Sequence, residues 1–315
     1  MISRYLRLQE RGILSINRRN ADFVSRYNAR RLFPLVDDKL KTKRLAIDAG
    51  IAVPELYEII ETEYQIKQID KLLKPYKDFV IKPAHGAGGD GIIVIADKVF
   101  DQYREINGKL NTSYDISYHL SRLLSGAYSL GGHSDYAIIE HRVVVDSVFK
   151  AVSYEGIPDI RVITLLGYPA MAMVRLPTRL SGGKANLHQG AIGVGVDLAT
   201  GKTLGGVFHN DVIAYHPDTL ASIVNITVPY WDTILNLAAR CYELTGLGYL
   251  GVDIVLDEKE GPLMLELNAR PGLNIQIANR EGALLRYRAI EEQAARGMES
   301  VAARVAFSQA MFGRS

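Results

Sequence analysis

The chain of 315 residues contains a single cysteine, Cys241, so it cannot form an internal disulfide bond. This excludes a disulfide-stabilised scaffold and is typical of a reducing compartment. The sequence also has no apolar run close to the roughly 18 residues that a membrane-spanning helix needs. Its first 14 residues alternate arginine with apolar side chains and form no signal-peptide core. We therefore expect a cytoplasmic protein.

A large net charge is absent as well, because 37 Lys and Arg residues face 35 Asp and Glu residues. Such a balance is not expected of a dedicated nucleic-acid or membrane binder. The first 50 residues nevertheless hold twelve basic and five acidic side chains, and Arg4, Arg7 and Arg11 fall at helical spacing. A solvated helical face is the favoured interpretation. Contact of residues 1–31 with a membrane surface or an acidic protein is a weaker alternative, and so is an organelle transit peptide.

With 48% hydrophobic residues, the chain can bury a sizeable core. Helical patterns and hairpins alternate irregularly without a fixed repeat, which favours α+β lobes over a doubly wound sheet. The local patterns predict helices over residues 37–49, 64–74, 97–134 and 228–246 and after 280, and strands at 51–56, 78–83, 92–95, 136–145, 159–166, 169–175 and in a hairpin at 250–268.

The predicted hairpin has two apolar strands around a polar turn at residues 257–262. A symmetric turn pairs residue 256 with residue 263 and therefore places Asp253 opposite Glu266. Two carboxylates in this position repel each other unless a cation lies between them. The alternative is a hairpin that faces solvent and carries the two acids by chance.

Asn268 lies on the same face as Glu266, since side chains alternate along a strand. Asp253, Glu266 and Asn268 therefore present three oxygen donors on one face. Oxygen ligands that include an amide suit Mg²⁺, which keeps waters and substrate phosphates in its other positions. The hairpin thus predicts a magnesium site, which Mn²⁺ could also occupy.

Lys82 ends a predicted strand and is followed by the glycine-rich segment His85–Gly91. The lysine can meet a phosphate as a point charge, and the glycines allow backbone N–H groups to approach phosphate oxygens. The spacing matches neither the P-loop nor the dinucleotide fingerprint. Asp90 inside the segment has no role in this interpretation, so the segment alone is weak evidence for nucleotide binding.

Asp159 and Arg161 share one face of a predicted strand, and the next strand ends at Arg175. A surface ion pair is the simplest interpretation of the first two. The polar loop Lys184–Gly190 follows, and nothing in its spacing assigns a reaction to it. The seven histidines form no zinc-binding pair at helical spacing, and no nucleophile-elbow sequence supports Ser-His-Asp catalysis.

Six short motifs occur in an order that resembles the ATP-grasp ligases, most closely the RimK-type branch and its alpha-L-glutamate-ligase-like proteins. The resemblance covers about residues 37–280. It implies an α+β fold in which two lobes grip a nucleotide. The motifs are Asp38-Lys39-Leu, Ile81-Lys82-Pro with its glycine segment, Asp159-Ile-Arg161, Asn186-Leu-His188, Gly251-Val-Asp253 and Leu265-Glu-Leu-Asn268-Ala-Arg-Pro-Gly.

The resemblance also implies roles for individual residues. Asp253, Glu266 and Asn268 match the magnesium ligands of the family. Arg161 and Arg175 match cations near the transferred phosphate. The positions that match ATP contacts are Lys39, Lys82, Gly86, Gly88, Gly89, Gly91, Glu140, His141, Asp159, Lys184 and Asn186. Among these, Glu140 and His141 would meet adenine through backbone groups.

By this resemblance the chain divides into four parts. These are a basic helical segment at 1–38, an N-terminal ATP-grasp lobe at 39–135 with a helical insertion at 97–134, a C-terminal lobe with the metal site at 136–280, and helices at 281–315. The branch usually carries a full α/β domain before the first lysine, where this chain has about 38 arginine-rich residues. That segment and the insertion help to shape the acceptor site in the family, so the amine substrate does not transfer from the resemblance.

The resemblance implies an ATP-dependent ligase that joins a carboxylate to an amine through an acyl phosphate. The partners would be ATP, a carboxylate and an amine such as glutamate or another amino acid, with a peptide or protein as acceptor and no nucleic acid. A small-molecule kinase on the same scaffold and a non-catalytic nucleotide-binding regulator are the alternatives. The kinase would form no amide, and the regulator would release no ADP.

Overall fold

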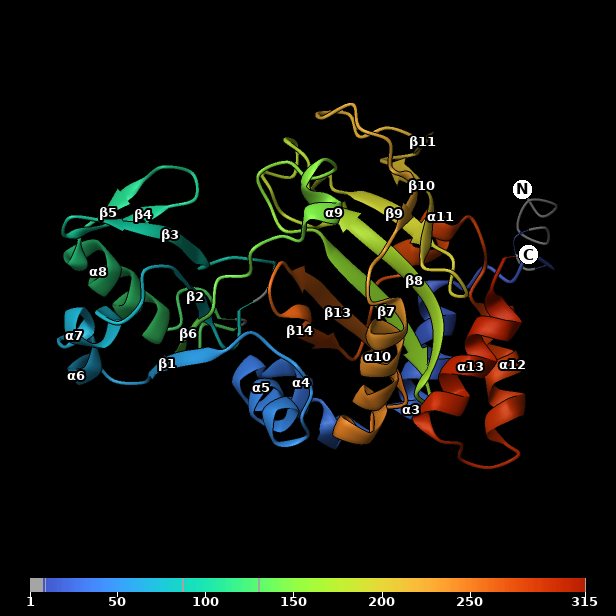
Figure 1. Cartoon of the computed structure of the whole chain (residues 1–315). Helices are drawn as coiled ribbons and strands as arrows, with labels where there is room; N and C mark the ends of the chain where they lie inside the picture. The colour runs from blue at the N-terminus through green and yellow to red at the C-terminus, as the bar shows by residue number, and fades with distance from the viewer. Residues whose placement is uncertain (1–7, 9, 87, 130, 315) are drawn as a thin grey trace. The chain divides into compact units, whose positions relative to one another are not determined.

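A computed structural model describes residue 8 and residues 10–86, 88–129 and 131–314. The chain forms two compact units. Unit 1 contains the described residues up to Val36, Leu45–Ala52 and the residues from Val144 onward, and unit 2 contains Asp37–Arg44 and Val53–Val143. Figure 1 shows the elements of both units in the order of the chain.

Unit 2 is built on a six-stranded antiparallel sheet in the order β1-β6-β2-β3-β4-β5. The predicted edge strand near residue 51 is indeed at the edge, but it begins later, at Leu56. The strands are β1 (Leu56–Ile60), β2 (Phe79–Pro83), β3 (Ile93–Val99), β4 (Gln102–Glu105), β5 (Leu110–Asn111) and β6 (Ala137–Glu140).

The helices of unit 2 cover its sheet. The longest, α8 (Ser113–Leu124), begins with a capping box between Thr112 and Asp115. It packs on α6 (Glu63–Ile66), α7 (Ile69–Leu73) and the strands (Figure 1). Its buried face consists of Ile116, Leu120 and Leu123, which follow the helical repeat. Among the described residues of 97–134 the structure has the end of β3, two short strands and one helix, where the sequence predicts inserted helices with a loose end rich in serine and glycine.

Unit 1 is built on a larger antiparallel sheet in the order β11-β10-β9-β8-β7-β13-β14, and β12 also pairs with β10. The predicted strands at 159–166 and 169–175 and the predicted hairpin are confirmed. Strands β9 to β12 were not predicted. The strands are β7 (Asp159–Leu165), β8 (Tyr168–Leu176), β9 (Ile192–Val196), β10 (Lys202–Phe208), β11 (Asp211–Ile213), β12 (Val224–Thr227), β13 (Tyr249–Asp257) and β14 (Gly261–Asn268).

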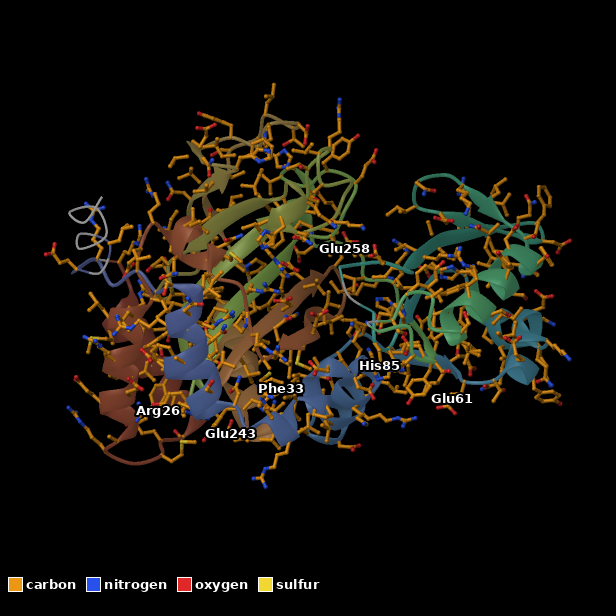
Figure 2. The ribbon with its side chains drawn as sticks, turned by 180° about the vertical axis from the view of Figure 1, so that it is seen from behind. Arg26, Phe33, Glu61, His85, Glu243 and Glu258 are labelled. Atoms are coloured by element: carbon orange, nitrogen blue, oxygen red, sulfur yellow. The ribbon has the colours of Figure 1, made fainter. Side chains whose placement is uncertain are left out.

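Helices pack on this sheet from both sides. Figure 1 shows α10 (Trp231–Thr245) in front of β7 and β13, and Figure 2, seen from behind, shows the N-terminal segment with Arg26 in front of the strands. Further helices in the described part of the chain are α2 (Ile16–Arg18), η1 (Arg19–Val24), α3 (Ser25–Tyr27), η2 (Arg30–Leu32), α4 (Pro34–Asp37), α5 (Lys39–Asp48), α9 (Ser147–Lys150), η3 (Leu187–Gln189), α11 (Asn274–Asn279), α12 (Leu284–Ala294) and α13 (Val301–Phe312).

The basic N-terminal segment packs against the rest of unit 1. Arg19 is buried and donates a hydrogen bond to the carbonyl of Pro271 at 2.6 Å. Arg26 forms an exposed ion pair with Glu291 at 3.1 Å. The predicted solvated arginine face therefore holds only in part, while Arg4 and Arg7 lie outside the described residues. Within the residues that the structure describes, no helix is both long enough and apolar enough to cross a membrane.

Candidate functional site

The hairpin of β13 and β14 places Asp253 directly opposite Glu266, as the sequence predicted. The turn itself is shifted by one residue from the symmetric register, because Leu256 pairs with Pro262. A bulge at Leu265 then restores the predicted pairing, since Ile254 pairs with Met264 and Asp253 pairs with Glu266. The bulge is therefore the local feature that aligns the two carboxylates.

Asp253 also lies opposite Arg161 on the neighbouring strand β7. Arg161 donates two hydrogen bonds to its carboxylate, from Nε at 2.7 Å and from Nη2 at 2.5 Å. Arg175 on β8 donates to the same carboxylate at 2.8 Å and pairs with Asp159 through both ends of its guanidinium group. We call Asp159, Arg161, Arg175, Asp253 and Glu266 the charged row. The simple surface ion pair of Asp159 with Arg161 is not observed.

The charged row holds ionised groups inside a protein sheet. Burial alone would raise the pKa of Asp253, but the two guanidinium groups lower it to about 2. Burial raises the pKa of Asp159 to about 6 in spite of Arg175, and the nearby Asp253 adds to this shift. The pKa of Arg175 is raised by Asp159 and Asp253, which outweigh its burial. Asp253 is therefore the carboxylate that stays charged across the physiological range.

Glu266 and Asn268 complete the predicted metal ligands. Asn268 donates its side-chain amide to Asp253 at 3.3 Å, which leaves the amide oxygen to accept other contacts. Glu266 is half-buried and makes no hydrogen bond or ion pair with any residue that the structure describes. Counted as ionised, the charged row has one more negative than positive charge. Its donor set fits a divalent cation, which would offset that charge.

In unit 2, Lys82 and Glu140 lie at neighbouring positions on β2 and β6. Lys82 Nζ lies 2.5 Å from Glu140 Oε1, and Lys43 Nζ lies 2.8 Å from Glu140 Oε2. All three side chains are buried. We call them the lysine cluster. It has one more positive than negative charge, which suits an anion such as phosphate.

Burial lowers the pKa of Lys43, with a further contribution from Lys82 and against the attraction of Glu140. The two lysines lower the pKa of Glu140 despite its complete burial. The sequence analysis assigned Glu140 a backbone contact with adenine and did not identify Lys43. Lys43 follows the predicted ATP ligand Lys39 by one helical turn, and that spacing was the signal available in the sequence.

The glycine-rich segment is held at its start by a polar network that the sequence analysis missed. The buried carboxylate of Asp135 accepts hydrogen bonds from the backbone N–H of His85 at 3.0 Å and from Ser129 at 2.8 Å. His85 Nδ1 lies 2.7 Å from the same carboxylate. Lys39 donates to the carbonyl of Gly86. The segment that carries the predicted phosphate-binding glycines is thus attached to β6 by Asp135.

Three glycines of the segment take a left-handed backbone conformation. Gly88, Gly89 and Gly91 have φ angles between 67° and 82°, a region that glycine tolerates without strain. A side chain at Gly91 would also collide with the ring of Tyr128. The loop geometry is therefore specific to glycine.

The remaining predicted ATP contacts lie in ordinary local structure. The backbone N–H of His141 donates to the carbonyl of Glu55 at 2.8 Å. Asn186 accepts a hydrogen bond from the backbone of His188 and caps the short helix η3. Lys184 is exposed two residues earlier. The nucleotide role of Lys184 and Asn186 stays a prediction.

A family model of sugar-transfer associated ATP-grasp proteins matches residues 18–292. A comparison with curated proteins gives no match. Among solved structures, the ATP-grasp ligase PsnB in complex with a minimal precursor is 15% identical, with a TM-score of 0.44, and the match covers 86% of this chain and 64% of PsnB. This chain therefore spans less than two thirds of the length of PsnB.

D-cycloserine synthetase DcsG is also 15% identical, with a TM-score of 0.46 and coverage of 84% of this chain and 72% of DcsG. D-alanine–D-alanine ligase from Bacillus anthracis is 14% identical, with a TM-score of 0.48 and coverage of 84% and 69%. These matches do not show that the chain belongs to the predicted RimK-type branch. Because the family model spans most of the sequence, the chain belongs to the sugar-transfer associated ATP-grasp family and has the ATP-grasp fold.

Proposed function

We propose that the protein is an ATP-dependent ligase that joins a carboxylate to an amine and releases ADP and phosphate. The observation that carries this proposal is the charged row, in which the buried carboxylates of Asp159 and Asp253 pair with two arginines on adjacent strands. Buried ion pairs are often no more stabilising than apolar residues of the same size. A role in binding charged substrates therefore explains the row better than a role in stability.

The lysine cluster supports the same proposal from unit 2. Its excess positive charge would attract nucleotide phosphates, and the backbone N–H groups of the glycine-rich segment would contact phosphate oxygens. Asp253, Glu266 and Asn268 would hold Mg²⁺ or Mn²⁺ in unit 1. When bound, the ion would neutralise phosphate oxygens.

The reaction we propose has two balanced steps. A carboxylate oxygen of the substrate attacks the γ-phosphorus of ATP, the bond from that phosphorus to the β,γ-bridging oxygen breaks, and ADP leaves. The amine nitrogen then attacks the acyl carbon, the carbon–oxygen bond to phosphate breaks, and the nitrogen loses a proton. Arg161 and Arg175 would stabilise the charge that develops on the transferred phosphoryl group. No covalent protein intermediate is needed, so the protein would contribute mainly positioning and charge.

A finer proposal is that the protein acts like the RimK-type ligases and adds an amino acid such as glutamate to a peptide or protein carboxylate. Its support is the order of the six motifs in the sequence. Arg161 and Arg175 would be the catalytic residues in this version as well.

The test is a screen for ADP release with amino acids paired with peptide or protein carboxylates, followed by mass spectrometry of the product. We expect one ADP for each amide formed. ADP release with a phosphorylated product and no amide would show a kinase instead. ATP binding without ADP release under any substrate mixture would contradict catalysis.

A further inference from the structure

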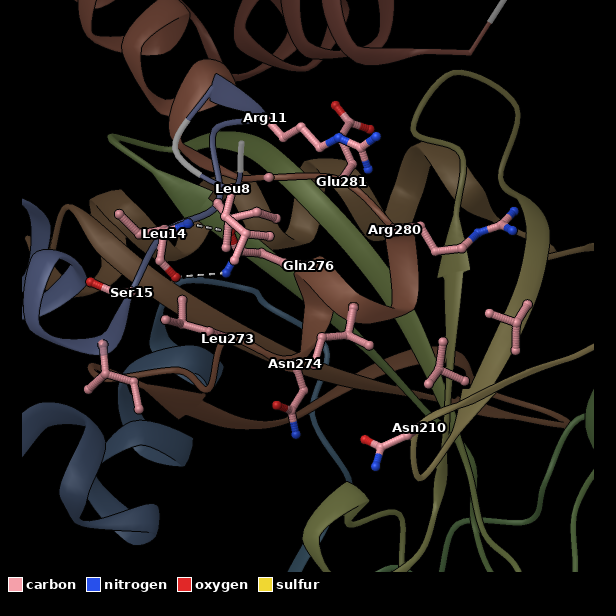
Figure 3. Close-up of a pocket in the computed structure, with 16 residues that line it drawn as sticks. Leu8, Arg11, Leu14, Ser15, Asn210, Leu273, Asn274, Gln276, Arg280 and Glu281 are labelled. Atoms are coloured by element: carbon pink, nitrogen blue, oxygen red, sulfur yellow. Dashed lines mark hydrogen bonds between the residues drawn. The ribbon is translucent and has the colours of Figure 1, made fainter. Parts of the chain in front are cut away.

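Unit 1 contains a cavity of about 750 Å³ among the N-terminal segment, helix α11 and the connection from β10 to β11 (Figure 3). None of the residues that we assign to ATP or to the divalent ion lines it. A smaller cavity of about 220 Å³ adjoins it. The residues that line both cavities are Val207, Asn210, Asn274 and Ile277.

The walls of the larger cavity are mainly apolar, and several of the side chains face solvent. The exposed fractions of Leu8, Ile16, Val212 and Ile277 lie between 50% and 62%. Single exposed apolar residues are common, but several around one cavity mark a binding site. Beneath them, Gln276 exchanges hydrogen bonds with the backbone of Leu14, which fixes the wall of the cavity (Figure 3).

Two arginines give the cavity a positive charge. Arg11 from the N-terminal segment and Arg280 from the end of α11 both line the cavity (Figure 3). Neither forms an ion pair with a residue that the structure describes. The carboxylate in the lining, Glu281, is already bound by Arg286 at 2.9 and 2.7 Å. The two guanidinium groups therefore have no anionic partner in the described part of the protein.

The position of Arg280 is itself unusual. It follows α11 with a φ angle of 53°, in the left-handed region where a helix normally ends with glycine. A side chain at this position therefore costs conformational energy, and here that side chain borders the cavity. Asn210 and Asn274 add amide groups to the lining, and these can orient a polar head group.

We propose that this cavity binds a small amphipathic anion, in which an apolar body fills the cavity and a carboxylate or phosphate head contacts Arg280. Guanidinium groups bind both heads through paired hydrogen bonds. The volume falls within the range of roughly 300–1,000 Å³ that is typical of small-molecule sites. The ligand enters from solution as a single molecule. None of the residues assigned to ATP or to the divalent ion lines the larger cavity, so this proposal does not depend on the ligase chemistry.

The test is calorimetric titration of the full chain with octanoate, octyl phosphate and octyl glucoside, each below its micelle concentration. We expect both anions to bind and the neutral octyl glucoside to bind at least about tenfold more weakly, because it lacks the charge-assisted hydrogen bonds. Equal binding of the neutral compound, or no binding of either anion, would overturn the proposal.

Variants locate the site. Arg280→Gln should weaken octyl phosphate binding by about tenfold, whereas Arg288→Gln, an exposed arginine on α12 outside the lining, should leave it unchanged. Ile277→Asp should remove binding while the melting temperature stays near that of the wild type, since Ile277 is exposed. Equal affinities for Arg280→Gln and the wild type would contradict the assigned head-group contact.

Two further experiments distinguish binding in this cavity from membrane binding and from binding at the charged row. Sedimentation with anionic phosphatidylglycerol vesicles, without binding of octyl phosphate, would show a membrane contact and overturn the single-molecule ligand. Glu266→Gln should leave octyl phosphate binding unchanged, since Glu266 does not line the cavity. The octyl phosphate titration can therefore be interpreted even if the ligase assay fails. A loss of octyl phosphate binding in Glu266→Gln would contradict the independence of the two sites.

Discussion

The two buried charge clusters of the protein differ in the sign of their excess charge. The charged row of unit 1 has one negative charge more than its arginines neutralise, and the lysine cluster of unit 2 has one positive charge more than Glu140 neutralises. The excess charge of each cluster is therefore opposite in sign to the charge of its proposed ligand. A divalent cation would complete the first, and nucleotide phosphate would complete the second.

The clusters also differ in how firmly their positive charges are fixed. A guanidinium group stays protonated in a protein, whereas a buried lysine can lose its proton. The charged row is built on arginines and the other cluster on lysines, one of which has a lowered pKa. We therefore expect the positive charges of the charged row to persist as the pH rises, whereas Lys43 in the lysine cluster should lose its charge.

The largest effect should come from removing a cation from the charged row. Arg175→Met would leave Asp159 and Asp253 buried with one guanidinium between them, and breaking a buried pair in this way costs about 3–5 kcal/mol. Glu140→Gln in the lysine cluster should cost less, about 1–3 kcal/mol, because Lys43, whose pKa burial already lowers, can release its proton. Urea unfolding of both variants tests this order.

The matched control for this pair is Arg288→Met, which replaces an exposed arginine on α12 and should change the free energy of unfolding little. Equal losses of stability in Arg175→Met and Glu140→Gln would contradict the difference between the two clusters.

The second prediction separates charge from stability within the charged row. Glu266→Gln should lower ATP turnover on the order of 100-fold with little change in stability, because Glu266 has no ion pair among the described residues. Asp253→Asn should abolish turnover and also destabilise the protein, since two arginines lose a partner. Steady-state ADP release and urea unfolding measure the two effects.

Glu260→Gln is the control on the same hairpin, where the side chain is exposed in the turn. Turnover near the wild-type rate in Glu266→Gln and Asp253→Asn would remove the metal assignment.

The third prediction concerns the lysine cluster. Lys82→Met should raise the dissociation constant for ATP by at least about tenfold, the value expected for one charge-assisted contact. Lys71→Met changes an exposed lysine of the same unit and should leave ATP affinity unaltered. Calorimetry with ATP and Mg²⁺ measures both, and an unchanged affinity in Lys82→Met would count against its contact with phosphate.

The smallest expected effect is the pH dependence of ATP binding. Burial lowers the pKa of Lys43, so this lysine releases its proton at a lower pH than a free lysine does. The lysine cluster then loses its excess positive charge, and ATP affinity should fall as the pH rises toward the pKa of Lys43. Lys43→Met should flatten this dependence. A profile that is identical in the variant and the wild type would exclude Lys43 as its source.

The hairpin shows how much of the site the sequence could predict. Strand alternation and a short polar turn were enough to pair Asp253 with Glu266. The bulge at Leu265 was not predictable, because several turn registers fit the same apolar pattern. The symmetric turn was wrong by one residue, and the bulge shifts the register back by one residue, so the predicted pair was still correct. The partners of Asp253 on β7 and β8 were also missed, since the order of strands in a sheet is not a local property.

The ATP-grasp fold was predicted from the order of six motifs, while strands β9 to β12 were not predicted from local pattern. β9 has the sequence Ile-Gly-Val-Gly-Val, in which a side chain at Gly195 would collide with α11 and one at Gly193 would collide with Leu187. Such glycines weaken the strand signal because they serve tertiary packing. The contact of Glu140 with Lys43 joins positions about a hundred residues apart, which no local pattern reveals.

The proposed function depends above all on binding of a divalent cation by the charged row when a nucleotide is present. Electron paramagnetic resonance of Mn²⁺ in the presence of ADP measures free and bound ion directly. The account predicts Mn²⁺ bound to the wild type and to Glu260→Gln, with at least about tenfold weaker binding in Glu266→Gln. Equal Mn²⁺ binding in all three proteins would contradict it.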